Sequence, residues 1–494
     1  MLMRAVARCL WLPILSLPLV LAGEAESGLV GAWLGSVELR DGRRLRLAFR
    51  VEGQDGSLTA LMDSVDEGLT DIAVASVTLQ ASRVRFFVPA FGGRFQGRLD
   101  SAKGRIVGVW LQGSERFWLV LARCAEVPRP PRPQNPVGPF DYRVVEVAFS
   151  HAPGRAASFL PRATPRDSAR ISLFGSLSLP PGAGPHPAVV LISGSGNNDR
   201  DHTIAGHRPF AVMADNLCRA GLAVLRFDDR GAGESTGRGF PDSTTRDFAD
   251  DARAAVSALR ARAEVDAERI GLIGHSEGAL IAAMVAADDA RLGCVVALAG
   301  PGLRGDQVIR RQAELIMAAR GASPELAAAQ RELLGRLHAV VLSGAAAPEK
   351  RRRLRAILRR HLELRGPRDP ERLAALIEPR VESLLSPWWS FFLAYDPAAA
   401  LRRLRCPVLA LVGSKDLQVE PGQSFGPVLR RLSEGRLPQL EARVMPSLNH
   451  LFQGCRSGLP EEYGRIQETV SPRVLEALRS FLTDVLCRRR GRWY

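Results

Sequence analysis

Gly274-His275-Ser276-Glu277-Gly278 is the stretch that decides the fold. An apolar run, Arg269 to Ile273, precedes it, and a helix-forming run without a breaker, Ala279 to Ala287, follows it. This order predicts a strand, a tight turn and a helix, with Ser276 on the turn. A side chain two residues before or after the serine would collide with the neighbouring helix or strand, so we expect glycine at both positions. A serine that stands clear of a sheet in this way is suited to act as a nucleophile.

The same five-residue pattern occurs a second time, around Ser235 between Gly233 and Gly237. This copy lies in a polar segment that is punctuated by glycine and proline, and no helix-forming run follows it. We therefore assign the nucleophile to Ser276 and interpret Ser235 as a loop hydroxyl.

The chain begins with a targeting segment. At 494 residues it is long enough for two or three domains. Residues 1–25 have the pattern of a signal peptide, with Arg4 and Arg8 followed by the apolar run Cys9 to Ala22 and by small residues up to Ala25. The apolar run is too short to span a bilayer comfortably. We expect export to the periplasm or the extracellular space, with no stable membrane insertion after the segment is removed.

Two segments precede the part of the chain that contains Ser276. Residues 26–124 alternate apolar and polar side chains at period two and contain the turn pairs Asp41-Gly42 and Asp55-Gly56. That pattern predicts antiparallel hairpins in a small β domain, either a barrel or a sandwich. Residues 125–140 are rich in proline and predict an extended linker.

Residues 141–494 alternate apolar strand runs with amphipathic helices. Ala188 to Ile192 is continuously apolar, as a strand covered on both faces requires. The fold class we predict is α/β, a doubly wound sheet with helices on both sides. The other expected strands are 142–149, 171–179, 223–227, 270–273, 295–299 and 408–412.

A long insertion interrupts this alternation. Residues 302–397 are almost wholly helical in pattern, apart from a weak strand signal at Val340 to Leu342. We interpret the insertion as a cap over the active site. Trp388, Trp389 and Phe392 lie near its end; two roles stay open for them, lining an acyl pocket or anchoring the cap.

Charge and cysteine content exclude several classes of function. The formal net charge is +15, but only three of the 67 basic residues are lysines. The arginines are scattered and no aromatic-rich nucleic-acid module accompanies them, so we expect no nucleic-acid partner. The chain has no CxxC pair and no His/Cys cluster at metal spacing, so we expect neither a metal nor a cofactor. Pairing of Cys455 with Cys487 stays open.

The partners of a nucleophilic serine can be sought by chain order. A serine hydroxyl needs a base to take its proton, and the base needs an acid to orient it. The strand 408–412 ends in a polar turn at Asp416, where sheets of this kind place their sites. Of the eight histidines, only His450 follows Asp416. The predicted catalytic set is Ser276, Asp416 and His450.

The tetrahedral intermediate of acyl transfer needs two backbone N–H donors. One is expected to be the amide of Glu277, at the start of the helix that follows the serine. The other is expected in the glycine-rich turn after the strand 188–192, from the amide of Ser195 or of Gly196.

These motifs resemble one family. Ile192-Ser193-Gly194-Ser195-Gly196, the run Leu225 to Ser235, the Gly274–Gly278 turn, the run Cys406 to Asp416 and Leu448-Asn449-His450-Leu451-Phe452 are similar to EstD-type bacterial carboxylesterases of the α/β-hydrolase superfamily. The similarity covers roughly residues 142–485. It implies the Ser276, Asp416 and His450 triad, hydrolysis of small-molecule carboxylic esters, and an N-terminal β domain of the type that exported members carry.

Two alternatives remain beside ester hydrolysis. The same residues could serve a serine peptidase or aminopeptidase, with Glu277 as the anchor for the substrate amine, or a thioesterase or deacetylase. The β domain and the basic surface could instead belong to an envelope-binding protein with secondary catalysis.

Overall fold

The structure is a computed structural model that describes residues 28–487, apart from 40, 41, 43, 55, 56, 90, 91, 114, 153–157, 160–169, 364–369 and 436. The predicted signal segment, residues 1–25, lies outside the described residues. The chain divides into two compact units. The first comprises the described residues up to Arg132 with Ile204–His207 and Pro460–Gln467, and the second comprises the remainder.

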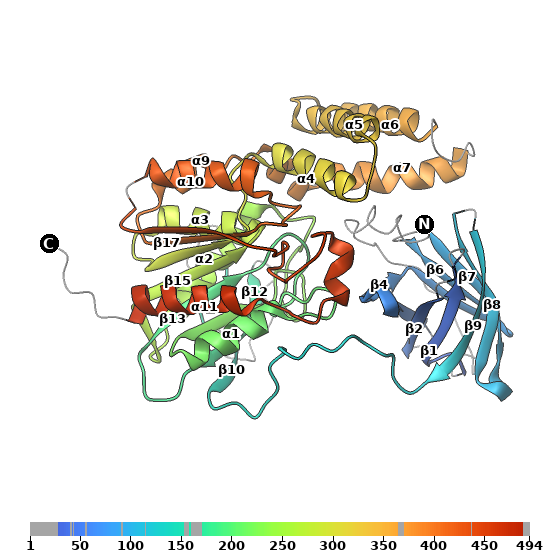
Figure 1. The fold of residues 1–494 in the computed structure, drawn as a ribbon, viewed down its shortest axis with the longest axis horizontal. Coiled ribbons are helices and arrows are strands. Elements are labelled where there is room, and N and C mark those ends of the chain that lie inside the picture. Colours follow the sequence, from blue (N-terminus) through green and yellow to red (C-terminus); the bar gives the residue numbers. More distant parts are fainter. Residues whose placement is uncertain are drawn as a thin grey trace. The chain divides into compact units, whose positions relative to one another are not determined.

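The first unit is a nearly closed antiparallel barrel (Figure 1). Its strands follow the order β4-β3-β2-β1-β9-β8-β7-β6-β5, and each neighbouring pair that joins strands along the sheet is antiparallel. Of the two expected forms, barrel and sandwich, the barrel is the one observed. The strands are β1 (Gly31–Glu38), β2 (Arg44–Gln54), β3 (Ser57–Ser64), β4 (Leu69–Val74), β5 (Ser76–Gln80), β6 (Arg83–Val88), β7 (Gly93–Asp100), β8 (Arg105–Gln112) and β9 (Glu115–Cys124).

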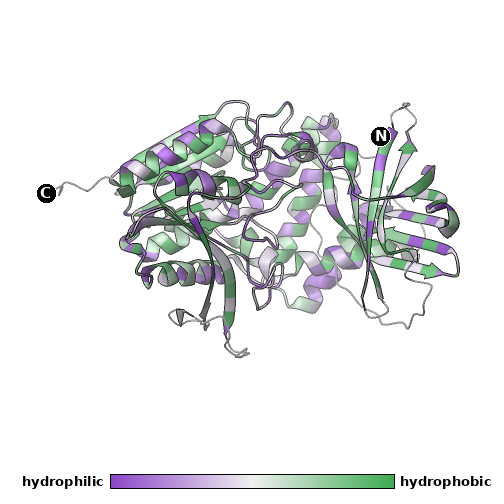
Figure 2. Ribbon diagram, turned by 90° about the horizontal axis from the view of Figure 1, so that it is seen from below, coloured by the Kyte–Doolittle hydropathy of each residue, from purple (hydrophilic) through white to green (hydrophobic). Residues whose placement is uncertain are grey.

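Alternation of side chains explains this barrel. In β6, Val84, Phe86 and Val88 are buried while Arg83 and Arg85 are exposed, because successive side chains of a strand point to opposite faces. The inward residues form one apolar core. The same alternation of hydrophobic and hydrophilic residues is visible along the barrel strands in Figure 2.

The second unit has the α/β architecture that its sequence pattern predicted, one sheet with helices on both sides. Its sheet has the order β11-β10-β12-β14-β13-β15-β16-β17-β18. The pairs from β11 to β14 are antiparallel, and those from β14 to β18 are parallel. The strands are β10 (Arg143–His151), β11 (Ser158–Phe159), β12 (Ile171–Leu179), β13 (His186–Ile192), β14 (Ala223–Phe227), β15 (Val265–His275), β16 (Cys294–Leu298), β17 (Val408–Gly413) and β18 (Leu440–Met445).

Helices cover both faces of this sheet, and alternate residues of each central strand supply the two cores. Val190 and Ile192 of β13 belong to one apolar cluster, whereas Val189 and Leu191 belong to the other. The first cluster includes residues of α2 (Thr245–Arg260), α3 (Glu277–Asp288), α9 (Ala398–Arg403) and α10 (Gly426–Ser433). The second includes residues of α1 (Pro209–Arg219) and α11 (Pro472–Leu482), on the opposite side of the sheet in Figure 1.

The described residues of the insertion form helices joined by short turns. The helices are α4 (Gly305–Ala319), α5 (Pro324–Leu342), α6 (Ala347–Glu363), α7 (Pro370–Leu384) and α8 (Pro387–Ala394). The weak strand signal at Val340 to Leu342 is wrong: these residues end α5, where Val340 and Val341 pack with Leu337 and Leu354 in the core of the insertion. A short apolar run cannot by itself distinguish a strand from a buried helical turn.

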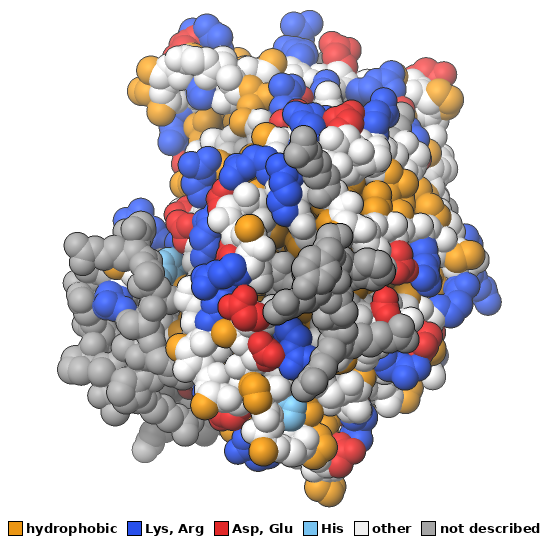
Figure 3. All heavy atoms as spheres, turned by 90° about the vertical axis from the view of Figure 1, so that its left-hand side faces the viewer, with side chains coloured by type: hydrophobic (Ala, Val, Ile, Leu, Met, Phe, Trp, Pro, Cys, Tyr) orange, Lys and Arg blue, Asp and Glu red, His pale blue; other side chains and the backbone are white. Residues whose placement is uncertain are grey.

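None of the helices in the described part of the chain combines the length and apolarity that spanning a membrane requires. The basic side chains are spread over the face shown in Figure 3, with acidic ones between them.

Candidate active site

Ser276 lies on the sharp turn between β15 and α3. Its backbone has φ 56° and ψ −120°, outside the regions that non-glycine residues usually adopt. Such a conformation costs on the order of 1–3 kcal/mol and persists only where its surroundings enforce it. Here the Ser276 amide donates to the carbonyl of Leu298 on the adjacent strand β16 (2.8 Å).

The two flanking glycines are required by contact distances. A Cβ on Gly274 would lie 2.1 Å from the carbonyl oxygen of Gly278, and a Cβ on Gly278 would lie 2.2 Å from that of Ile192. Both clashes involve backbone atoms, which cannot turn aside. The steric reason predicted for glycine at these positions is confirmed.

Asp416 and His450 form a buried hydrogen-bonded pair. The His450 Nδ1 lies 2.8 Å from the Asp416 Oδ2, and the two side chains are almost completely buried. The other carboxylate oxygen, Oδ1, accepts the backbone N–H groups of Gln418 and Val419, each at 2.8 Å. Because a carboxylate only accepts, His450 donates from Nδ1, and its Nε2 is left able to accept a proton.

Ser276 and His450 are brought to the same edge of the sheet. Strands β15, β17 and β18 run parallel, so the residues after their carboxyl ends meet there. His275, next to Ser276, donates from Nε2 to the carbonyl of His450 (2.9 Å). No hydrogen bond joins the Ser276 hydroxyl to His450 among the residues that the structure describes.

The glycine-rich turn after β13, residues 193–198, lies against the serine. A Cβ on Gly194 would be 3.2 Å from the Ser276 Cβ. Gly196 has φ +129°, a conformation that L side chains rarely adopt. Gly194 thus lies against the candidate nucleophile, and the next residue, Ser195, hydrogen-bonds through its side chain to Glu277. We call residues 193–198, for which the sequence predicts the second oxyanion donor, the oxyanion turn.

Glu277 has a backbone and a side chain in different surroundings. It is the first residue of α3, where the free N–H groups of the helix and its dipole favour negative charge. Its buried carboxylate accepts from the Thr245 hydroxyl (2.6 Å) and from the Trp388 indole N–H (2.9 Å to Oε2). Burial raises the pKa of this carboxyl, and hydrogen bonds from Thr245, Ser195 and Trp388 oppose the rise.

The aromatic residues of α8 differ in exposure. Trp388 is buried, stacks on Phe392 at a centroid distance of 4.8 Å and packs edge-on against Phe240. These contacts, with the bond to Glu277, are those of an anchor between the insertion and α3. Trp389 is only partly buried and lies edge-on to Trp388.

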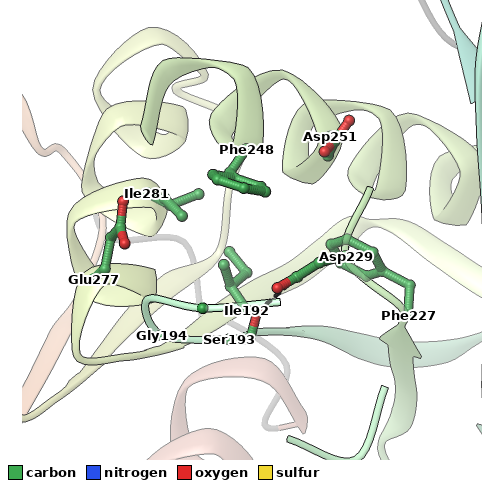
Figure 4. Close-up of a pocket in the computed structure, with 10 residues that line it drawn as sticks. Ile192, Ser193, Gly194, Phe227, Asp229, Phe248, Asp251, Glu277 and Ile281 are labelled. Carbon is green, nitrogen blue, oxygen red and sulfur yellow. Dashed lines mark hydrogen bonds between the residues drawn. The ribbon is translucent and has the colours of Figure 1, made fainter. Parts of the chain in front are cut away.

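A small cavity borders the oxyanion turn, and Figure 4 shows residues that line it. Its volume is about 10 Å³, room for about one water molecule. Ligand pockets usually enclose at least ~300 Å³, so this cavity does not house a substrate. Its lining includes Asp229, Asp251 and Glu277, and Figure 4 shows Ser193 bonded to Asp229.

Sequence reasoning did not predict the bonding roles of four residues beside the site: Asn198, His202, Asp229 and His275. Asp229 follows the carboxyl end of β14, and this position was the available signal, since such ends carry functional groups in α/β sheets. The hydrogen bonds of the two histidines join segments that are 73 residues apart, which no local pattern indicates.

Two other sequence-based hypotheses concerned Ser235 and the pair Cys455 and Cys487. Ser235 is buried in a loop, where its hydroxyl donates to the carbonyl of Asp228 and accepts the amide of Phe174. No disulfide joins Cys455 to Cys487 in the structure.

The sheet order and the strand–serine–helix turn together define the α/β-hydrolase fold. Residues 204–366 match the profile of the family described as "Serine aminopeptidase, S33" (Hydrolase_4). Esterase EstD of Thermotoga maritima is 30% identical over 315 residues, which are 62% of this chain and 64% of EstD. The matched part thus covers slightly less than two thirds of that relative.

Solved structures resemble the chain more distantly. The α/β-hydrolase GrgF from Penicillium sp. sh18 is 17% identical, with a TM-score of 0.41 over 70% of this chain and 100% of GrgF. The Pyrococcus furiosus esterase Pf2001 is 18% identical, with a TM-score of 0.40 over 74% of this chain and 98% of the esterase. The fold assignment therefore rests on the topology of the chain itself.

Proposed function

We propose that the protein is a serine hydrolase of carboxylic esters. The observation that carries the proposal is the buried pair of His450 and Asp416, at the edge of the sheet where Ser276 lies on a strained turn. The similarity to an esterase, EstD, agrees with it.

In the proposed reaction, Ser276 Oγ attacks the ester carbonyl while His450 Nε2 takes its proton. Asp416 holds the imidazole with its Nδ1–H toward the carboxylate and stabilises the imidazolium. The amide of Glu277 and the amide of Ser195 or Gly196 donate to the oxyanion. The alkoxide leaves with the proton from His450, and water then attacks the acyl-enzyme by the same route. Catalytic hydrogen bonds are often long without substrate, so the bond from Ser276 to His450 is expected to form in the complex.

The surroundings of the Glu277 carboxylate help to distinguish an ester substrate from a peptide substrate. An aminopeptidase needs a free carboxylate for the substrate amine, but this one accepts hydrogen bonds from Thr245 and Trp388. The structure thus favours an ester over an N-terminal amine as substrate.

The test is hydrolysis of p-nitrophenyl esters from acetate to palmitate by the wild type and by Ser276→Ala. We expect the wild-type activity to peak at one chain length. We expect Ser276→Ala to lose most of its turnover and to keep a residual rate of about 10³–10⁴-fold above that of the uncatalysed reaction, which substrate binding and the oxyanion donors supply. Amino-acid anilides serve as the parallel series. Hydrolysis of anilides but not of esters would replace the proposal by a peptidase, and equal activity of Ser276→Ala would refute the nucleophile.

We further propose that residues 1–25 direct export and that the barrel determines location rather than catalysis. Full esterase activity in a chain that begins near Phe140, with loss of attachment to cell envelopes, is the expected result. Loss of activity in that folded chain would assign the barrel a catalytic role.

A further inference from the structure

Behind the candidate site lies a group of buried polar residues that the proposed reaction does not use. The Asp229 carboxylate accepts three hydrogen bonds from the two ends of the oxyanion turn. Ser193 Oγ donates to Oδ1 (2.7 Å), and Asn198 donates to Oδ2 from its backbone N–H (3.1 Å) and from Nδ2 (3.0 Å). The Asp229 amide in turn donates to the carbonyl of Asn198 (3.0 Å). Asp229 thus clamps the turn on both sides.

From Asn198 the contacts continue to the loop of the candidate base. Asn198 Oδ1 lies 3.1 Å from His202 Nδ1, and His202 Nε2 lies 3.2 Å from His275 Nδ1. His275 Nε2 lies 2.9 Å from the carbonyl oxygen of His450. His202, His275 and Asp229 are all buried. We call Asp229, Asn198, His202 and His275 the buried polar chain.

The orientation of the Asn198 amide is fixed by its other partners. Its Nδ2 lies 2.8 Å from the carbonyl of Gly194 and 3.0 Å from Asp229 Oδ2, and both of these atoms require an N–H. The atom that faces His202 is therefore the amide oxygen. The histidine pair consequently lies between two acceptors, Asn198 Oδ1 and the His450 carbonyl.

Counting protons shows what this arrangement requires. Three contacts, two at the ends and one between the rings, need three N–H groups, whereas two neutral imidazoles supply two. Burial lowers the pKa of His202 to about 4 and that of His275 well below its usual value. The carboxylate of Asp199 opposes this shift at His202, and the neighbouring His450 adds to it at both rings. The pair is therefore neutral near pH 7 and one proton short.

The chemistry of the partners indicates where the proton is missing. The backbone carbonyl of His450 only accepts, so we expect His275 Nε2, 2.9 Å from its oxygen, to keep its N–H. The shortage then falls on His202, which donates in only one of its two directions. Whether His202 donates to Asn198 or to His275, the His275 Nε2–H donates to the backbone carbonyl of His450.

We propose that the buried polar chain is a positioning device, which fixes the general base and the oxyanion turn relative to each other. The proposal rests on the proposed function of Ser276 and His450. The two loops come from separate parts of the sequence, residues 193–202 and 446–452, and the buried polar chain joins them through side chains. Displacing a reacting group by about 1 Å can lower a rate by on the order of 100-fold, so this link governs turnover.

The test compares His202→Asn and Asp229→Asn with the double variant. Asparagine tolerates the left-handed backbone of His202 (φ 54°) but is too short to reach His275, and at Asp229 it removes the charge with little change in shape. Each single variant should lower kcat roughly 10- to 100-fold and change KM less than about threefold, because substrate contacts are untouched. The double variant should lose little more than the worse single one, since both interrupt the same chain.

The matched control is His338→Asn, which removes a buried histidine of the insertion outside this chain. Circular dichroism and thermal melts establish that each variant is folded. The proposal is overturned if the folded variants keep kcat within about twofold of the wild type, or if the two losses multiply in the double variant.

A second measurement is independent of turnover. Two-bond ¹H–¹⁵N spectra of histidine-labelled protein at pH 7 should show neutral His275 with its proton on Nε2, and His202→Asn should shift the His275 signals. A proton on Nδ1 of His275 would refute the proposed bonding. If the wild type neither hydrolyses esters nor reacts with a fluorophosphonate at Ser276, the proposed function fails, and the spectra alone then decide whether the buried polar chain exists.

Discussion

At the scale of single residues, the surroundings of a serine distinguish the candidate nucleophile from a structural hydroxyl. Ser276 and Ser235 share one sequence pattern, yet only Ser276 follows a strand and opens a helix. The Ser235 hydroxyl donates a hydrogen bond to the carbonyl of Asp228 and accepts one from the amide of Phe174. Identical patterns therefore lie in different surroundings, because their flanking elements differ.

Asp416→Asn tests the orienting role of the acid. The amide can donate to His450 Nδ1, which would favour the wrong tautomer of the imidazole. We expect kcat to fall by about 10⁴-fold, with KM changed less than about threefold, in steady-state kinetics on the best p-nitrophenyl ester. A loss below about tenfold would show that His450 does not depend on Asp416.

Ser235→Ala tests the structural role of the second serine. Because the hydroxyl is buried and bonded to Asp228 and Phe174, its removal should lower the free energy of unfolding by about 1–3 kcal/mol in urea titrations. Esterase activity below the transition should stay within about twofold of the wild type, because the serine takes no part in the reaction. Loss of activity in the folded variant would reopen the assignment of the nucleophile.

At the scale of elements, helix α3 connects the serine turn to the insertion. Its first residue, Glu277, provides the candidate backbone donor and also holds Trp388 of α8 and Thr245 of α2 through its side chain. One residue thus fixes two helices to the turn. These hydrogen bonds compensate for the burial of a carboxylate at this position.

Trp388→Phe tests this anchor. Phenylalanine keeps the stacking on Phe392 but leaves the buried Glu277 carboxylate without one donor, so the free energy of unfolding should fall by about 1–3 kcal/mol. Thermal and urea denaturation measure the change. Trp389→Phe is the control, since its ring is partly exposed, and it should cost less. An equal loss in both variants would mean that packing, and not the bond to Glu277, fixes α8.

At the scale of the whole molecule, buried histidines link stability to pH. Burial lowers the pKa of His202, His207 and His338 to about 4 and also lowers that of His275 well below its usual value. The unfolded chain takes up these protons near pH 6.5, whereas the folded chain does not. Stability from these groups is therefore complete above pH 6.5 and is lost as the pH falls toward 4.

Two buried carboxyls act in the opposite sense. Burial raises the pKa of Asp229 to about 7 and raises that of Glu277, so their contribution is complete below pH 4 and is lost as the pH rises. The four histidines outnumber them. We expect the melting temperature to fall from pH 7 to pH 5, with about 1.4 kcal/mol per pH unit for each net proton. His338→Asn should make the melting temperature fall less between pH 7 and pH 5. A melting temperature that rises toward pH 5 would contradict the expected dominance of the buried histidines.

The two-unit organisation was only partly visible in the sequence. Ile204–His207 and Pro460–Gln467 lie within the predicted hydrolase segment, yet they group with the barrel unit. Arg132 explains part of this grouping, because its guanidinium donates to the carbonyls of Ala205, Gly464 and Ile466. Contacts from one side chain to three distant carbonyls leave no periodic signal in the sequence.

The sequence by itself determined the features that arise from local sterics and periodicity. Continuous apolar runs specified the parallel strands, alternation specified the barrel strands, and glycines at 274 and 278 specified the turn at Ser276, since a Cβ there would meet backbone atoms. Chain order also singled out Asp416 and His450, which the structure brings within 2.8 Å of each other.

Only the tertiary structure decided which polar side chains meet behind the site. The sheet order places the ends of β13, β14, β15 and β18 at one edge, and this proximity brings Asp229, Asn198, His202 and His275 into one buried chain. The physical reason is that a buried polar group must find a partner wherever the fold places one, and that partner can come from any distance along the sequence.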